Sequence, residues 1–275
     1  FEKNENVLIS LPGVPFEMKS LFESECINLI KKRFILPYIY HRIIKTVGIG
    51  ESWLSDKISS WEKNLDESLS LAYLPSIGRV KLRLTGKGDN ISKLKAKVKK
   101  EEKTLVKLIN KYIYGYDNDE LENIIGDFLI KENKSISIAE SCTGGNISNV
   151  ITSVPGSSQY FLGGIIAYSN DIKINYLDVD KGILNKYGAV SKEVAEQMAK
   201  NVRIRFKSSI GISSTGIAGP SGGTKEKPVG TIWIAFSDKE KTISKKLILT
   251  KRRDVNIILT TINALNLLRK NLKID

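Results

Sequence analysis

A serine and a cysteine stand side by side in a turn that is rich in small residues. The segment ESCTGG (140–145) follows an apolar run that predicts a strand, and a helix is expected to begin near Asn146. Small residues at a strand-to-helix turn let backbone N–H groups approach a ligand closely, and the helix N-terminus adds partial positive charge there. This combination suits a phosphate cradle or an oxyanion hole, with a purely structural glycine-rich turn as the alternative.

Ser141 is a candidate nucleophile, because strand–turn–helix elbows present a serine in this way. A histidine base is almost excluded, since the chain contains a single histidine, His41. A lysine can take the serine proton when burial lowers its pKa toward neutrality. Lys173 and Tyr168, near the end of a later apolar segment, complete a candidate Ser-Lys-Tyr set, and Cys142 is the rival nucleophile.

A second glycine-rich segment follows the predicted strand at 210–214. Thr215 and Gly216 end that strand, and five glycines lie between positions 216 and 230, more than a simple turn requires. Backbone donors of such a loop can wrap a ribose or a phosphate, whereas the alternative is a flexible surface loop. Arg253, at a later strand-to-helix junction, can clamp a phosphate through two N–H groups or simply face solvent.

The composition restricts the class of protein further. Of the 275 residues, 41% are hydrophobic and 27% are charged, which is typical of a globular protein. One histidine and two cysteines, Cys26 and Cys142, exclude a paired-histidine metal site and a Cys₄ cluster, and we predict neither a metal nor a cofactor. Cysteines this sparse predict reduced thiols in a cytoplasmic protein, and no apolar run approaches the roughly 18 residues that cross a membrane.

The formal net charge is +13, and its densest part is a predicted helix that begins after Asp89 and Asn90. Eight lysines from Lys93 to Lys111 surround an apolar stripe on this helix. They form either a solvated helix face or a surface that binds RNA. We favour the solvated face, so a nucleic-acid partner is permitted by the charge but not expected.

The order of the predicted elements divides the chain into three parts. Residues 1–35 offer one short strand and one helix, too little to close a core. Residues 36–115 follow the order β-α-β-β-α, which is typical of a small α+β sandwich. Residues 116–275 interleave apolar strands with helices, which predicts an α/β layered domain. The strands predicted in this last part are 135–139, 163–168, 210–215, 231–236 and 246–250, and the main helices are 192–206 and 254–272.

These segments together resemble one family. AESCTGG, GGIIAYSNDIK, YGAVS and TGIAGPSGGTKEKPVGTIWIAF are similar to the carboxy-terminal domain of CinA (competence/damage-inducible) proteins, over about Asp117 to Asp275. VGIGESWLSDKI and AYLPSIGRVKLRLTG resemble the KH-like middle domain of that family. LPGVPFEMKSL resembles the end of its molybdopterin-binding-like amino-terminal domain. The resemblance therefore implies an α/β/α amidohydrolase domain after a KH-like α+β domain and the tail of a domain that is otherwise missing.

The resemblance also implies an activity, the hydrolysis of nicotinamide mononucleotide (NMN) to nicotinate mononucleotide and ammonia in pyridine nucleotide recycling. Ser141 would attack the carboxamide, Lys173 would take the serine proton, and Tyr168 would assist proton transfer. The other residues that the resemblance assigns to the substrate are Thr143, Gly144 and Gly145 for the oxyanion, Thr215 and Gly216 at the strand end, and Arg253 for the phosphate. The resemblance further implies a homo-oligomer.

Two other functions stay open from the sequence. The first is a non-catalytic nucleotide- or RNA-binding protein of the same family, although Gly86-Lys87-Gly88-Asp89 departs from the G-x-x-G loop of RNA-binding KH domains. The second is ADP-ribose pyrophosphatase activity, which the resemblance implies only where a full amino-terminal domain is present.

Overall fold

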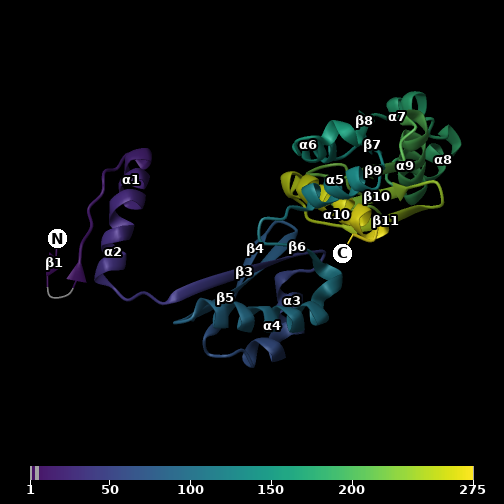
Figure 1. Cartoon of the computed structure of the whole chain (residues 1–275). Helices are drawn as coiled ribbons and strands as arrows, with labels where there is room; N and C mark the ends of the chain where they lie inside the picture. The colour runs from purple at the N-terminus through teal and green to yellow at the C-terminus, as the bar shows by residue number, and fades with distance from the viewer. Residues whose placement is uncertain (1, 4–5, 275) are drawn as a thin grey trace.

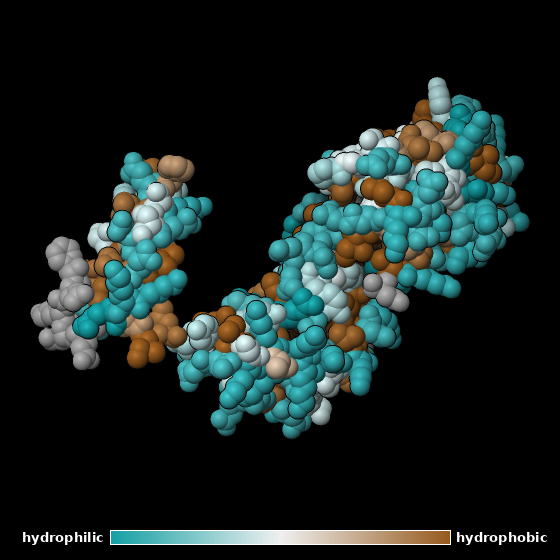
Figure 2. All heavy atoms as spheres, viewed as in Figure 1, coloured by the Kyte–Doolittle hydropathy of each residue, from teal (hydrophilic) through white to brown (hydrophobic). Residues whose placement is uncertain are grey.

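Three groups of elements follow one another in the computed structural model, which describes residues 2–3 and 6–274 (Figure 1). The first group contains β1 (Glu2–Lys3), β2 (Asn6–Val7), α1 (Pro15–Leu21) and α2 (Ile27–Arg33), with a π-helical turn at Phe22–Cys26 between the helices. Many of its apolar side chains are exposed, among them those of Phe16 and Ile35. Figure 2 shows hydrophobic atoms on the surface of this group. One helical rod cannot bury both of its faces, so this group has no core of its own.

The middle group is a four-stranded antiparallel sheet in the order β4-β5-β3-β6, with two helices packed on it. Alternate residues of β5, such as Val80, Leu82 and Leu84, are buried against these helices. The predicted order β-α-β-β-α is present and is followed by one more short strand. The elements are β3 (Tyr38–Val47), α3 (Glu51–Lys63), β4 (Leu69–Ser76), β5 (Arg79–Gly88), α4 (Ile91–Ile109), a 3₁₀ turn at Asn110–Tyr112, and β6 (Ile113–Tyr116).

The third group is a five-stranded sheet between two layers of helices, which confirms the predicted α/β/α architecture. Its order is β11-β10-β9-β7-β8, with β7 parallel to β8 and β9, and β10 antiparallel to β9 and β11. Helices α5, α6 and α10 pack on one face, and α7, α8 and α9 pack on the other. The elements are α5 (Leu121–Lys131), β7 (Ile136–Glu140), α6 (Asn146–Thr152), a 3₁₀ turn (Ser157–Gln159), β8 (Phe161–Ile166), α7 (Asn170–Leu177), α8 (Lys181–Tyr187), α9 (Lys192–Phe206), β9 (Ile210–Gly216), β10 (Thr231–Ser237), β11 (Thr242–Ile248) and α10 (Arg253–Asn271).

The edge strand β11 begins four residues earlier than the sequence predicts. It pairs with β10 from Thr242 onward, directly after a tight turn in which Asp238 accepts hydrogen bonds from the N–H groups of Glu240 and Lys241. Polar residues dominate the first half of this strand because one side of an edge strand faces solvent. The apolar run on which the predicted strand 246–250 was based overlaps only the end of β11.

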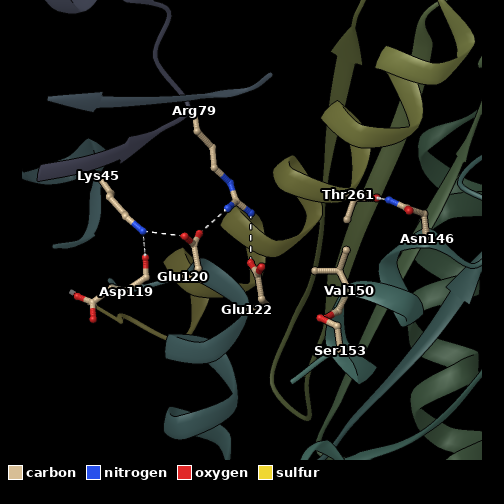
Figure 3. Close-up of polar contacts among 9 residues, drawn as sticks. All are labelled: Lys45, Arg79, Asp119, Glu120, Glu122, Asn146, Val150, Ser153 and Thr261. Atoms are coloured by element: carbon tan, nitrogen blue, oxygen red, sulfur yellow. Dashed lines mark hydrogen bonds and ion pairs between the residues drawn. The ribbon is translucent and has the colours of Figure 1, made fainter. Parts of the chain in front are cut away.

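Partly buried ion pairs connect the middle sheet to the start of α5 (Figure 3). The Lys45 ammonium donates to the Glu120 carboxylate at 2.7 Å and to the Asp119 carbonyl at 2.5 Å. Arg79 pairs with the same Glu120 at 3.1 Å and with Glu122 at 3.2 Å. Lys45 is only 2% exposed, so these acceptors compensate for the loss of its hydration. The contacts therefore join the second and third groups.

Hydrogen bonds to the carboxylate of Glu140 stabilise the turn between β7 and α6. One carboxylate oxygen accepts the hydroxyl of Thr143 at 2.6 Å and the N–H groups of Gly145 and Ile147 at 3.1 and 3.0 Å. The other accepts the N–H and the hydroxyl of Ser148 at 2.8 and 2.7 Å. Glu140 is 1% exposed. Its side chain thus satisfies N–H groups of the first helical turn that would otherwise have no partner.

Two further features shape the same turn. Gly144 and Gly145 have φ values of 61° and 100°, in the left-handed region that favours glycine. Asn146, the first residue of α6, donates to the Thr261 hydroxyl of α10 at 2.7 Å (Figure 3). The backbone that follows Ser141 is therefore fixed by contacts from two neighbouring elements.

We predict that Glu140→Gln lowers the free energy of unfolding by about 2–4 kcal/mol, because it places an NH₂ group among hydrogen-bond donors and removes a charged acceptor. Urea unfolding followed by circular dichroism measures this change. Glu132→Gln, at the exposed end of α5, removes the same charge and is expected to leave the unfolding midpoint unchanged. Equal losses in the two variants would contradict the prediction.

Candidate active site

Ser141 and Lys173 meet beside the carboxyl end of β7. The Lys173 Nζ lies 3.1 Å from the Ser141 Oγ. Lys173 stands on α7, whose first turn is capped by the Ser169 hydroxyl as it accepts the Ile172 N–H. Side chains on a helix lean toward its N-terminus, and this brings the ammonium back over the turn that carries the serine. The structure therefore joins two residues that are 32 positions apart in the sequence.

The Lys173 amine is surrounded by carbonyl oxygens and not by carboxylates. Its Nζ donates to the carbonyls of Ala167, Tyr168 and Ser169 at 2.7, 3.4 and 3.5 Å. The side chain is 1% exposed, and none of the ion pairs in the described part of the chain includes it. Burial lowers the pKa of Lys173 to about 8. A neutral amine is thus accessible near physiological pH, and its lone pair can accept the proton of Ser141.

Cys142, the rival nucleophile, is in a different environment. Its thiol is buried, and burial raises the pKa of Cys142 to about 12. The thiolate is the reactive form of cysteine, and this pKa keeps it scarce near neutral pH. The contact with Lys173 and the raised pKa of Cys142 therefore favour Ser141 over Cys142 as the candidate nucleophile.

Some backbone N–H groups of the turn after Ser141 donate hydrogen bonds within the protein, and others do not. Gly144 donates to the Ser141 carbonyl at 3.1 Å, and Gly145 donates to Glu140. Within the described residues, the N–H groups of Cys142 and Thr143 donate to no protein oxygen. A Cβ built on Gly144 would meet no heavy atom within 4 Å, so space is open beside the turn. The donors available to an oxyanion are thus those directly after the serine.

The threonines assigned to the substrate have internal hydrogen bonds. The Thr143 hydroxyl donates to Glu140 and lies 2.7 Å from the Ser214 hydroxyl, and the buried Thr215 hydroxyl donates to the Ala189 carbonyl at 2.8 Å. Gly216 is packed so closely that a Cβ would lie 2.5 Å from the Ile232 side chain. These contacts position the ends of β7 and β9 around the turn.

Tyr168 and Arg253 form a pair at the surface of the site. Tyr168 is 59% exposed, and its hydroxyl accepts a hydrogen bond from Arg253 at 2.7 Å. Arg253, the first residue of α10, also donates to the Gly219 carbonyl in the glycine-rich loop at 3.1 Å. The structure therefore brings Arg253, the residue predicted to bind the phosphate, into contact with the tyrosine and with that loop. The hydrogen bond of the tyrosine hydroxyl is to Arg253 and not to Ser141 or Lys173.

Two residues of this site were not assigned a role from the sequence. Glu140 holds the turn through its side chain, and the carbonyl of Ser214 accepts the Ser141 N–H at 2.9 Å. A signal was present for the first, because Glu140 is the one charged residue of the predicted strand and its end. Ser214 carries no comparable signal, since its role depends on the pairing of β7 with β9.

The described residues of the chain also bear on a metal site and on a membrane span. They contain no group of three His, Cys, Asp or Glu side chains arranged to hold a metal ion. None of the described helices combines the length and the apolar character that a membrane span requires.

Comparison with known proteins relates both large groups of elements to one family. The model of the CinA C-terminal domain matches residues 118–272, and that of the damage-inducible protein CinA KH domain matches residues 41–115. A CinA-like protein of Cytophaga hutchinsonii is 50% identical over 273 residues, which cover 99% of this chain and 65% of that protein. A putative competence-damage inducible protein of Halothermothrix orenii is 45% identical with the same coverage. The chain thus spans about two thirds of the length of these relatives.

Solved structures resemble the third group of elements. The competence/damage inducible protein of Agrobacterium tumefaciens matches with a TM-score of 0.53 and 32% identity, over 56% of this chain and 97% of that one. A CinA superfamily protein of Klebsiella pneumoniae matches with a TM-score of 0.54 and 25% identity, over 56% of this chain and 96% of that one. On the evidence of its two matched domains and its relatives, the chain belongs to the CinA family.

Proposed function

We propose that this chain hydrolyses the carboxamide of NMN to nicotinate mononucleotide and ammonia. The observation that carries the proposal is the 3.1 Å contact between Ser141 and a buried lysine that has no carboxylate partner among the described residues. Two free N–H donors follow the serine, and an arginine lies at the edge of the same site. A nucleophile, a base, oxyanion donors and a cation for phosphate are the parts that this reaction requires.

The first step forms the bond between serine and substrate. Neutral Lys173 takes the proton of Ser141 while the serine oxygen attacks the carboxamide carbon, and the electron pair of the carbonyl moves to its oxygen. The N–H groups of Cys142 and Thr143 donate to this oxyanion, and each such bond contributes roughly 3–4 kcal/mol to barrier lowering in measured cases. The pyridinium ring of the substrate withdraws electrons and makes its own carboxamide more electrophilic.

The second step releases ammonia and then the product. Protonated Lys173 returns its proton to the amide nitrogen, the C–N bond breaks, and an ester to Ser141 remains. A water molecule then attacks the ester carbon while the same amine takes its proton. The bond from this carbon to the Ser141 oxygen breaks, the protonated amine returns the proton to that oxygen, and nicotinate mononucleotide is released. Assistance by Tyr168 in these transfers stays a prediction. Its hydroxyl accepts a hydrogen bond from Arg253 at 2.7 Å, which supports a role beside the proposed phosphate-binding residue.

We expect Ser141→Ala to reduce ammonia release from NMN by at least about 10³-fold, because the reaction loses its nucleophile. Cys142→Ala leaves both the serine and the backbone donors in place, so it is expected to retain most of the activity. A coupled ammonia assay measures both, with melting temperatures to confirm folding. An active Ser141→Ala protein would refute the serine mechanism, and an inactive, folded Cys142→Ala protein would restore Cys142 as the nucleophile.

The pH dependence should follow the amine of Lys173. Its pKa is lowered to about 8, so the amine is protonated and unable to accept a proton below that pH. We expect kcat/KM for NMN to rise about tenfold per pH unit below pH 8 and to level off above it. Lys173→Arg keeps the charge but stays protonated, and should be inactive at every pH, whereas Lys192→Arg on the exposed start of α9 should keep the wild-type profile. A profile that is flat from pH 6 to 9 would contradict this assignment.

Arg253 is expected to bind the phosphate. Arg253→Gln should raise the KM for NMN about 10- to 100-fold with little change in kcat, because it removes charge-assisted hydrogen bonds to a group remote from the reaction. Arg252→Gln is the matched control, since that neighbouring guanidinium is exposed and pairs with Asp254. Kinetics with nicotinamide riboside, which lacks the phosphate, should be insensitive to both changes. A similar effect of Arg253→Gln on the riboside would exclude this role.

A further inference from the structure

A cavity outside the candidate active site lies where the middle group of elements meets the third. Its volume is about 820 Å³, a size typical of sites for small organic molecules. The middle group supplies the end of α4, the 3₁₀ turn after it and β6, and the third group supplies α5 and the end of α10. Residues that line this space, the junction cavity, include Val106, Lys111, Ile113, Ile124, Lys270 and Lys273.

Hydrogen bonds between the two groups fix the wall of the junction cavity. The Arg269 guanidinium of α10 is 4% exposed, and it donates to the Ile113 carbonyl at 2.9 Å and to the Lys111 carbonyl at 3.4 Å. It also donates to the Ile274 carbonyl at 3.0 Å. These contacts hold the end of α10 against the turn after α4, so little ordering of the chain would oppose the binding of a ligand.

Positive charge outweighs negative charge in the lining. Asp119 is the one carboxylate among the described lining residues, and one of its oxygens accepts the Tyr116 N–H at 2.8 Å. None of the three lysines that line the cavity takes part in an ion pair among the described residues. The cations of the lining are Lys111, Arg269, Lys270 and Lys273.

These cations are close enough to oppose one another. Burial lowers the pKa of Lys270, and the neighbouring cations Lys245 and Arg269 lower it further. Charges of one sign that share a site are unfavourable unless an anion offsets them. The junction cavity therefore suits a ligand that carries several negative charges.

Part of the lining is apolar. Ile113 is buried, and Val106 and Ile124 are partly buried at the edges of the two neighbouring cores. An inorganic anion would leave these side chains in contact with water, whereas an organic group would cover them and gain from the burial. The lining thus suits an anion that has an organic body.

We propose that the junction cavity binds a small organic molecule that carries two phosphate groups. Two phosphates have a charge of about −3 to −4 near pH 7, which matches four cations and one carboxylate in the lining. The lysine ammonium groups would contact the phosphates, and the apolar side chains would contact the organic body. A nucleoside diphosphate and a sugar bisphosphate share this chemistry.

The junction cavity is separate from the candidate active site, although α10 contributes to both. Arg253 begins this helix and Arg269 lies near its end, 16 positions later. At 1.5 Å per residue the two positions are about 24 Å apart along the helix. The proposal therefore does not require the amidohydrolase reaction, and failure of that reaction would leave it unaffected.

Isothermal titration calorimetry with the whole chain tests the proposal. The ligands are ADP and fructose 1,6-bisphosphate, their monophosphate counterparts AMP and fructose 6-phosphate, and inorganic pyrophosphate. We expect ADP or fructose 1,6-bisphosphate to bind one per chain with a Kd below about 100 µM in about 50 mM salt. The matching monophosphate and pyrophosphate should each bind at least about tenfold more weakly, because one lacks a phosphate and the other lacks the organic body. Tighter binding of ADP would assign the organic body to a nucleoside, and tighter binding of the bisphosphate would assign it to a sugar.

Matched variants locate the binding. Lys270→Gln/Lys273→Gln should weaken binding of the tighter ligand by at least about tenfold. Lys241→Gln/Lys246→Gln removes the same charge from exposed positions on the third group outside the cavity, and should change the affinity less than about threefold. Melting temperatures confirm that each variant is folded.

Two further variants separate the apolar contacts and the two sites. Val106→Thr should weaken binding of the organic ligand about three- to tenfold and leave that of pyrophosphate unchanged, because it places a hydroxyl on the apolar part of the lining. Arg253→Gln should change the affinity less than about threefold, since that guanidinium lies at the other end of α10.

Four results would overturn the proposal. They are no binding of either organic ligand by the wild-type chain, equal affinity for pyrophosphate, equal losses in the two double lysine variants, and loss of binding in Arg253→Gln. The second would reduce the cavity to a site for inorganic anions, and the last would place the bound ligand at the candidate active site.

Discussion

A lysine amine buried with no carboxylate partner among the described residues is the constraint on which the candidate active site depends. Moving an ammonium out of water is unfavourable, and carbonyl oxygens compensate for only part of its lost hydration. The Ala167 carbonyl makes the shortest of these contacts with Lys173, at 2.7 Å. A carboxylate in that position would stabilise the charged form and keep the amine protonated. The Lys173 amine can therefore be neutral and act as a base, because no carboxylate of the described residues pairs with it.

The nearby negative charge is held by other donors. Glu140 accepts five hydrogen bonds from the turn and from the start of α6, which accounts for its carboxylate without Lys173. Its main-chain carbonyl accepts the Ala167 N–H at 2.7 Å, and Ala167 in turn accepts the bond from the lysine amine. Glu140 thus orients the turn that carries Ser141 through its side chain. Through its backbone carbonyl it orients Ala167, whose own carbonyl accepts from Lys173. The contact between Ser141 and Lys173 follows from the pairing of β7 with β8.

The sequence predicts the parts of this arrangement that depend on local chemistry. A small-residue turn after an apolar strand indicates Ser141, and the scarcity of histidine directs attention to Lys173. Glu140 was not identified because a carboxylate at the end of a strand is recognised as a cap only when the helix donors around it are known. The bond between Tyr168 and Arg253 joins residues 85 positions apart, which no local pattern encodes.

The same distinction applies to a groove that α4 forms with β3 and β6. The spacing of its lysines is readable as one face of a helix, but a groove also requires a second wall, which β3 and β6 supply from residues far along the chain. The residues that line this groove lie between positions 40 and 116, so it is separate from the candidate active site. A mononucleotide has one phosphate group, and the guanidinium of Arg253 at the edge of the site is the cation that we propose for it. Helix α4 packs on the four-stranded sheet of the middle group and not on the sheet that carries the site, so neutralising the substrate does not account for its lysines.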